Sequence, residues 1–229
     1  APHGANQTLW PSASSLNFVE AAFHHACSLF PSPTIHIGGA TTDWTPWESD
    51  SSLMRAGLTS GAAIERLFID RALRTLHFHG RGAAAWDSLT KAYPTPPPGT
   101  TLLAHRPRNA GRRAAESSGA PWVLADADIL TLSHPGRTNS PLESAHALFD
   151  NLTHALRGER LKGVEAVAWS STVTTPDLLF YHLLPRLLVI AEAAWHGEDS
   201  LPWDKLAPLV EQEMAHLMRS VPYWNPQRP

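Results

Sequence analysis

The stretch that decides the fold is Thr34-Ile35-His36-Ile37-Gly38-Gly39-Ala40-Thr41-Thr42-Asp43-Trp44-Thr45-Pro46-Trp47. It begins as a short apolar strand over residues 34–37, continues into two glycines and ends in a loop rich in tryptophan. Two glycines directly after an apolar strand indicate a backbone that needs positive φ angles or lies close to another group. In α/β folds the carboxyl end of a strand is where ligands bind. The stretch therefore predicts an α/β fold and locates a candidate site.

Short apolar segments of strand length alternate with amphipathic helical patterns along the rest of the chain. Strands are predicted at residues 34–37, 83–87, 101–105, 122–125 and 164–169. Helices are predicted at residues 15–30, 61–79, 108–118, 144–156, 176–195 and 203–220, and a loop at residues 44–50. This alternation is typical of parallel β/α units. Five such units are fewer than the eight of a complete (β/α)8 barrel.

The composition limits the classes of function. A chain of 229 residues with 43% hydrophobic residues fits one domain, or most of one barrel. The net charge of −3 and a pI near 6.5 give no attraction to nucleic acid or to an anionic membrane. Polar residues interrupt the longest apolar run, residues 178–195, so no membrane span is predicted. Cys27 is the single cysteine, which excludes an internal disulfide and favours a small buried side chain.

The opening stretch also resembles the catalytic segment of the family 20 glycoside hydrolases, the β-N-acetylhexosaminidases. His36-Ile37-Gly38-Gly39 and, two residues later, Thr42-Asp43-Trp44-Thr45-Pro46-Trp47 carry the resemblance. Further segments match the family in the same order, at residues 29–33, 80–87, 163–171 and 185–195. The resemblance covers nearly the whole chain. It implies one domain over residues 1–229 that comprises the C-terminal five β/α units, strands 4 to 8, of the family's (β/α)8 TIM barrel.

The resemblance also implies which positions should carry the chemistry. In the family the two residues after Gly-Gly are an Asp that orients the acetamido group of the substrate and a Glu that is the general acid. Those positions are Ala40 and Thr41 in this chain. Neither side chain exchanges a proton near neutral pH. Since a general acid contributes roughly 10²–10⁴-fold in rate, the resemblance predicts a catalytically inactive chain.

Other polar positions of the family's pocket are altered as well. The family commonly has a sugar-stacking Trp where this chain has His105, and a Glu that binds sugar hydroxyls where it has Ser171. Trp86, Asp87 and Trp169 are retained. The resemblance therefore implies a vestigial substrate pocket made of His36, Gly39, Asp43, Trp86, Asp87, His105, Trp169 and Ser171.

Three functions stay open from the sequence. The leading one is an inactive hexosaminidase-like subunit with a structural or interaction role and with residual binding of N-acetylhexosamine-containing glycans. The second is an active β-N-acetylhexosaminidase whose catalytic groups are altered or supplied by another chain. The third is a repurposed barrel enzyme that uses His and Asp side chains at strand ends. We expect no cofactor and no metal, because the candidates for this third site lack a recognisable ligand spacing: His36, Asp87, His105, Asp126 and Asp128.

Aromatic residues offer a further interpretation. Tryptophans could stack on sugars, although packing in the core or at an interface is an equal expectation. The residues concerned are Trp44, Trp47, Trp122 and Trp169.

A five-unit barrel leaves two sheet edges open. We therefore expect another protein chain, either an N-terminal fragment or a separate subunit, to supply strands 1 to 3 in a hetero-oligomer. Two N-glycosylation sequons, Asn6-Gln7-Thr8 and Asn151-Leu152-Thr153, favour a lumenal or extracellular location in the secretory pathway.

Overall fold

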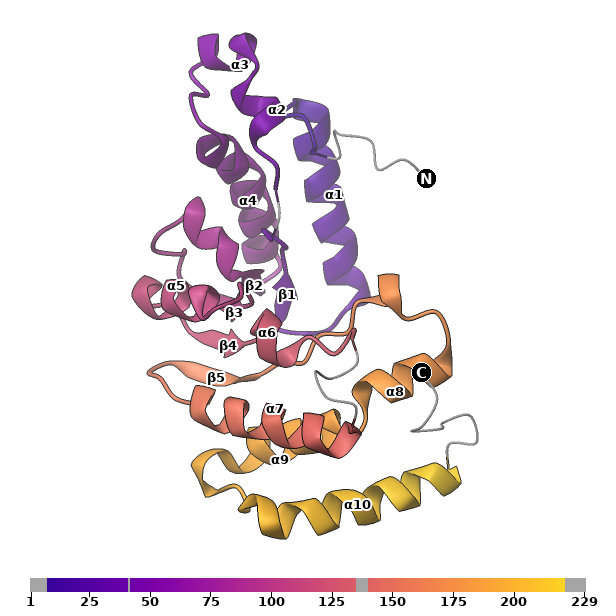
Figure 1. Cartoon of the computed structure of the whole chain (residues 1–229). Helices are drawn as coiled ribbons and strands as arrows, with labels where there is room; N and C mark the ends of the chain where they lie inside the picture. Colours follow the sequence, from indigo (N-terminus) through magenta and orange to yellow (C-terminus); the bar gives the residue numbers. More distant parts are fainter. Residues whose placement is uncertain (1–7, 41, 135–139, 221–229) are drawn as a thin grey trace. The chain divides into compact units, whose positions relative to one another are not determined.

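Parallel strands alternate with helices along the chain (Figure 1). The structure is a computed structural model that describes residues 8–40, 42–134 and 140–220. The chain divides into two compact units, Ala1–Ala104 with Gly111–Trp122, and His105–Ala110 with Val123–Pro229.

The strands and helices follow the predicted order. The strands are β1 (Thr34–His36), β2 (Gly82–Trp86), β3 (Thr100–Ala104), β4 (Trp122–Leu124) and β5 (Leu161–Val164). The α-helices are α1 (Ala13–Leu29), α2 (Thr45–Glu48), α3 (Ser51–Arg55), α4 (Gly61–Phe78), α5 (Ala110–Ser118), α6 (Ala127–Leu130), α7 (Pro141–Ala155), α8 (Pro176–Leu183), α9 (Arg186–His196) and α10 (Trp203–Ser220). Short 3₁₀ helices are η1 (Asp87–Lys91), η2 (Ser170–Thr172) and η3 (Gly197–Asp199).

The sheet has the strand order β1-β2-β3-β4-β5. In the first unit β1 pairs parallel with β2, with Thr34 opposite Gly82, and β2 pairs parallel with β3, with Trp86 opposite Leu103. Parallel neighbours that follow one another in sequence need a long crossover, which α4 provides between β1 and β2, and η1 with the segment after it provides between β2 and β3. The predicted parallel β/α units are confirmed.

One face of β1 and β2 packs against helices. Ile35 of β1 and Ala83 of β2 lie in a cluster with Cys27 of α1 and Leu76 of α4. Cys27 is 7% exposed, which confirms its expected burial. Helices α1 and α4 also pack against each other (Figure 1).

The other face of β1 is open. Because successive side chains alternate between faces, Thr34 and His36 point away from the helices, and both are exposed while Ile35 is half-buried. In β2 the same alternation buries Ala83 and Ala85 and leaves Trp86 half-buried. Within this unit, the face opposite the helices is therefore only partly covered.

The predicted loop at residues 44–50 is wrong, since α2 begins there at Thr45. Pro46 stands in the first turn of α2, where a missing backbone N–H costs nothing, and its fixed φ suits a helix. Asp50 then caps α3 by accepting the N–H groups of Ser52 and Leu53.

The predicted strand at residues 164–169 also lies too late in the sequence. The strand β5 ends at Val164, and the residues after it make separate backbone bonds, such as Glu165 N–H to the Leu124 carbonyl at 2.8 Å. Val167 forms only an isolated parallel bridge with Thr131. Residues 165–167 therefore form separate hydrogen bonds with residues 124–131, without the continuous hydrogen-bond ladder of a strand.

The predicted long helix at residues 176–195 is two helices. Helix α8 ends at Leu183 and α9 begins at Arg186, on either side of the cis peptide bond between Leu184 and Pro185. Proline removes a helical hydrogen bond and clashes with the preceding turn, so the helix breaks there. No single helix of the described residues is long and apolar enough to span a membrane, and α8 with the segment Arg186–Asp199 meets that criterion only as a pair bent by 45°.

Candidate functional site

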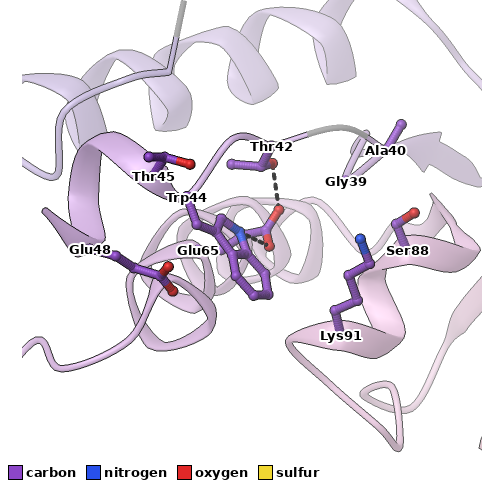
Figure 2. A pocket seen from close by; sticks show the side chains of 9 residues that line it. All are labelled: Gly39, Ala40, Thr42, Trp44, Thr45, Glu48, Glu65, Ser88 and Lys91. Atoms are coloured by element: carbon purple, nitrogen blue, oxygen red, sulfur yellow. Dashed lines mark hydrogen bonds between the residues drawn. The ribbon is translucent and has the colours of Figure 1, made fainter. Parts of the chain in front are cut away.

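The loop after β1 and the first turn after β2 border a pocket in the first unit (Figure 2). It encloses about 160 Å³. Its lining combines two carboxylates, one ammonium group, hydroxyls and an indole, and consists of Gly39, Ala40, Thr42, Trp44, Thr45, Glu48, Glu65, Ser88 and Lys91.

The double glycine brings the chain into this pocket. Gly38 has a φ of +84° and Gly39 a φ of +83°, so both adopt the conformation that other residues rarely tolerate. The predicted positive φ angles are confirmed. The turn presents Ala40 to the pocket, whereas Thr41 lies outside the described residues. The resemblance places an acidic residue at position 40. The side chain that lines the pocket there is the methyl group of Ala40.

Glu65 is the carboxylate at the centre of this pocket. It is only 8% exposed and accepts hydrogen bonds from Thr42 Oγ1 at 2.6 Å and from Trp44 Nε1 at 2.9 Å (Figure 2). Each of its two oxygens accepts one hydrogen bond from the loop. Glu65 thus fixes the loop after β1 to helix α4.

Sequence reasoning missed Glu65. The sequence pattern of α4 could have indicated it, because Glu65 lies on the same buried helix face as Ile69, Ala72 and Leu76. A charged residue in register with a buried apolar stripe needs a polar partner. Which partner it has depends on the path of the loop from residue 42 to residue 44, which helical periodicity does not describe.

Glu48 and Lys91 complete the charges around the pocket. Glu48 Oε1 accepts the backbone N–H of Gly61, the first residue of α4, at 3.0 Å. Lys91 lies at the end of η1, and in Figure 2 its ammonium group points toward the space between Glu65 and Ser88. The pocket therefore offers both a hydrogen-bond acceptor set and a cationic donor.

The other predicted residues of the first unit lie beside this pocket without lining it. His36 packs edge-on against Trp86, with ring centroids 5.1 Å apart, and its Nδ1 accepts the N–H of Gly38 at 3.1 Å. Asp43 is exposed and accepts the N–H of Thr45 at 3.0 Å. Hydrogen bonds from Thr45, first from its side chain and then from its backbone, lower the pKa of Asp43. Asp87 is completely buried at the start of η1.

The predicted residues of the second unit form a separate group. His105 Nδ1 lies 2.8 Å from the Ala125 carbonyl, and its ring packs edge-on against Trp169 at 6.1 Å. Trp169 is 45% exposed, and its backbone N–H donates to Ser133 Oγ at 2.5 Å. Ser171 lies in η2 with an exposed side chain. This group presents an aromatic surface with a histidine at its edge.

Two aspartates follow β4 in the same unit. Asp126 is 3% exposed and accepts the N–H of Asp128 at 2.8 Å. Burial, with a smaller contribution from the charge of Asp128, raises the pKa of Asp126. Asp128 accepts the N–H of Arg108 at 2.8 Å. Among the residues that the structure describes, no three His, Cys, Asp or Glu side chains gather as metal ligands would.

Of the two alternatives for the tryptophans, packing in the core holds for two of them. Trp47 is 2% exposed and Trp122 is fully buried, so neither ring can stack on a ligand. Trp44 is half-buried and donates to Glu65. Trp169, at 45% exposure, is the most exposed of the four.

Parallel β/α units with functional side chains after the carboxyl ends of their strands define the class of this protein as a barrel-type α/β domain. The glycosyl hydrolase family 20 catalytic domain, as a family sequence model, matches residues 3–198. The chain therefore belongs to glycosyl hydrolase family 20, and its fold is part of that family's TIM barrel. Both confirm what the resemblance implied.

Individual relatives agree with this assignment. The chain is 36% identical over 67 residues to the β-N-acetylhexosaminidase of Cellulomonas fimi, which covers 29% of this chain and 12% of that protein. The crystal structure of a β-N-acetylhexosaminidase superposes with a TM-score of 0.77 at 19% identity and covers 99% of this chain and 52% of its own. The structure of the exo-β-N-acetylglucosaminidase of Vibrio harveyi in complex with N-acetylglucosamine has the same TM-score and sequence identity. That alignment includes 95% of this chain and 37% of the Vibrio chain.

These relatives are much longer than the matched region. The chain spans 12% of the length of the Cellulomonas protein and 52% and 37% of the two solved chains. The structural likeness at 19% identity supports the fold alone.

The double acceptor role of Glu65 leads to a prediction for Glu65→Met. The substitution removes both carboxylate oxygens, so the Thr42 hydroxyl and the Trp44 indole N–H lose the acceptor that they share. We expect a loss of about 1–3 kcal/mol in the free energy of unfolding, measured by urea denaturation.

Glu48→Gln is the matched control, because its amide oxygen can still accept the Gly61 N–H. We expect a change within about 0.5 kcal/mol for this variant. Equal losses in the two variants would contradict the role given to Glu65.

Proposed function

We propose that this chain is a catalytically inactive β-N-acetylhexosaminidase-like subunit with a structural or interaction role in a larger assembly. The observation that carries the proposal is Ala40, whose methyl group lines the pocket at a position where the family has a carboxylate. Thr41, at the position of the general acid, likewise has no group that titrates near neutral pH.

Glu65 does not replace the lost acid. A general acid has to face the leaving group of the substrate, whereas both oxygens of Glu65 already accept hydrogen bonds from Thr42 and Trp44 within the protein. This carboxylate therefore serves to stabilise the loop.

We also propose that N-acetylhexosamine-containing glycans still bind weakly at Trp169. Its indole is 45% exposed and has His105 at its edge, and an exposed aromatic face suits the apolar face of a sugar ring. Ser171 nearby in sequence offers a hydroxyl in place of the family's carboxylate. Such a site could recognise a glycan without cleaving it.

The assembly role rests on the open face and edge of β1. Parallel strands are normally covered on both faces, and β1 has helices on one face and exposed Thr34 and His36 on the other. Another polypeptide that supplies strands 1 to 3 would cover this face and pair with the edge. We further propose a secretory location, which the exposed Asn151 of the second sequon supports.

Asp126 favours a second candidate function. Burial raises its pKa, which is the direction that favours a general acid, and the carboxyl lies two residues after the end of β4. With His105 and Asp128 in the same unit, it is the starting point for either a hexosaminidase with altered catalytic groups or a repurposed hydrolase.

Activity assays separate these functions. With a chromogenic N-acetyl-β-glucosaminide and the protein purified from its natural source, we expect turnover at the buffer background. The double substitution Ala40→Asp and Thr41→Glu should raise it by roughly 10²-fold or more, because it returns the missing acid. Substantial turnover by the unaltered protein that is lost in Asp126→Asn would refute inactivity and establish the second function.

Residual glycan binding can be measured by saturation-transfer NMR with N-acetylglucosamine. We expect binding in the unaltered chain and a loss of at least tenfold in affinity in Trp169→Ala, since stacking on the indole is removed. Trp195→Ala is the control, because Trp195 is 86% exposed on α9. Binding that persists in Trp169→Ala would exclude this site.

The assembly role predicts a change in amide hydrogen exchange. Amides of β1 should exchange at least tenfold more slowly in the natural assembly than in this chain alone, because edge N–H groups gain partners. Leu102 is the internal control, since its N–H already bonds the Pro121 carbonyl at 2.9 Å. A natural protein that runs as a lone 25.0 kDa chain, with β1 already protected, would overturn the proposal.

A further inference from the structure

A basic cluster lies buried where α8 gives way to α9, in the second unit. Arg186 is 7% exposed and His182 is 4% exposed. The Nη2 group of Arg186 donates to the His134 carbonyl at 2.6 Å and to the carbonyl of His182. The guanidinium therefore ties the segment after α6 to the break between the two helices.

The charge of Arg186 has no counter-charge in the described part of the chain. No carboxylate pairs with it among the described residues, where its two partners are carbonyl oxygens. The remaining residues, 1–7, 41, 135–139 and 221–229, contain neither Asp nor Glu. A guanidinium keeps its charge at all physiological pH values, and a buried charge without a partner is unfavourable. Burial accordingly lowers the pKa of Arg186.

Unused hydrogen-bond donors accompany this charge. Within the described residues only Nη2 of Arg186 makes hydrogen bonds, which leaves the N–H groups of Nη1 and Nε for another acceptor. A guanidinium presents its donors as a planar fork that matches two oxygens of a carboxylate, phosphate or sulfate.

His182 supplies an independent sign of a missing partner. Its Nδ1 is buried and has no hydrogen-bond partner within the described part of the chain. Arg186 donates to the carbonyls of both His182 and His134, which places the three residues together. Burial lowers the pKa of His182, and the charges of Arg186 and His134 lower it further. Natural proteins rarely leave a buried polar side-chain atom unpaired.

The start of α9 adds to the positive potential. This helix has 11 residues and begins at Arg186, and its N-cap, Pro185, provides no side-chain hydrogen bond. The first N–H groups of a helix carry a partial positive charge that favours anions.

We propose that Arg186, His182 and the N-terminus of α9 form a binding site for one small oxyanion. The ligand class is phosphate, sulfate or a carboxylate, held by the free edge of the guanidinium and by Nδ1–H of His182. The site uses none of the residues assigned to the glycan pocket and does not depend on the proposed function.

Thermal unfolding of the chain tests the site. Phosphate, sulfate and acetate are titrated separately from 0 to about 20 mM, with chloride at matched ionic strength as the reference. A ligand that binds the folded state raises Tm in a saturable manner. We expect a rise of several degrees with at least one oxyanion and none with chloride. Preference for phosphate or sulfate identifies a tetrahedral ion, and preference for acetate identifies a carboxylate.

Two variants assign the shift to this cluster. His182→Phe keeps the ring volume and removes the unpaired nitrogen, and Arg186→Lys keeps the charge and removes the fork. Each should weaken apparent oxyanion affinity at least tenfold. His25→Phe is the control, because His25 is an exposed histidine on α1 and should leave the affinity unchanged.

A second measurement needs no variant, in case either one fails to fold. In crystals of the unaltered chain soaked in selenate, the anomalous signal should lie within hydrogen-bond distance of the Arg186 guanidinium. The absence of a saturable Tm shift, an equal shift in His182→Phe and His25→Phe, or a selenate signal only elsewhere would each overturn the site.

Discussion

Parallel strands have to be covered on both faces, and much of this structure follows from how far that requirement is met. In the first unit, α1 and α4 cover one face of β1 and β2 through Cys27, Leu76 and Ala83. On the other face His36 meets Trp86, and both Thr34 and His36 of β1 are exposed. The same alternation that builds the helix-side core therefore leaves an inner surface that a complete barrel would bury.

The candidate site illustrates how a scaffold can persist after its catalytic groups change. Gly38 and Gly39 keep the turn at the end of β1, while Ala40 presents only a methyl group. The polarity of the pocket now comes from Glu65, a buried carboxylate from the adjacent helix that Thr42 and Trp44 hold in place. Its role is to stabilise the loop, since both of its oxygens are already used as acceptors.

Much of the fold could be predicted from the sequence, because hydrophobic periodicity and the Gly and Pro residues that end helices and strands are local features. Gly61 and His79 bracket the helix α4 that the pattern predicts. The predictions failed where local signals compete. Pro185 stands inside an apolar helical pattern and splits it into α8 and α9, and Pro46 starts a helix in a segment read as a loop. Val164 ends the last strand although apolar residues continue to Trp169.

The sequence by itself determined the family, the order of the β/α units and the absence of an acidic side chain at Ala40 and Thr41, because motif residues and their spacing are read directly from the chain. Only the tertiary structure decided that Glu65 reaches the loop after β1, that Trp122 is buried while Trp169 is accessible, and that Arg186 has no carboxylate partner among the described residues. These facts depend on which side chains meet across distant segments. Periodicity assigns a residue to a face, whereas burial and pairing depend on what the fold brings against that face.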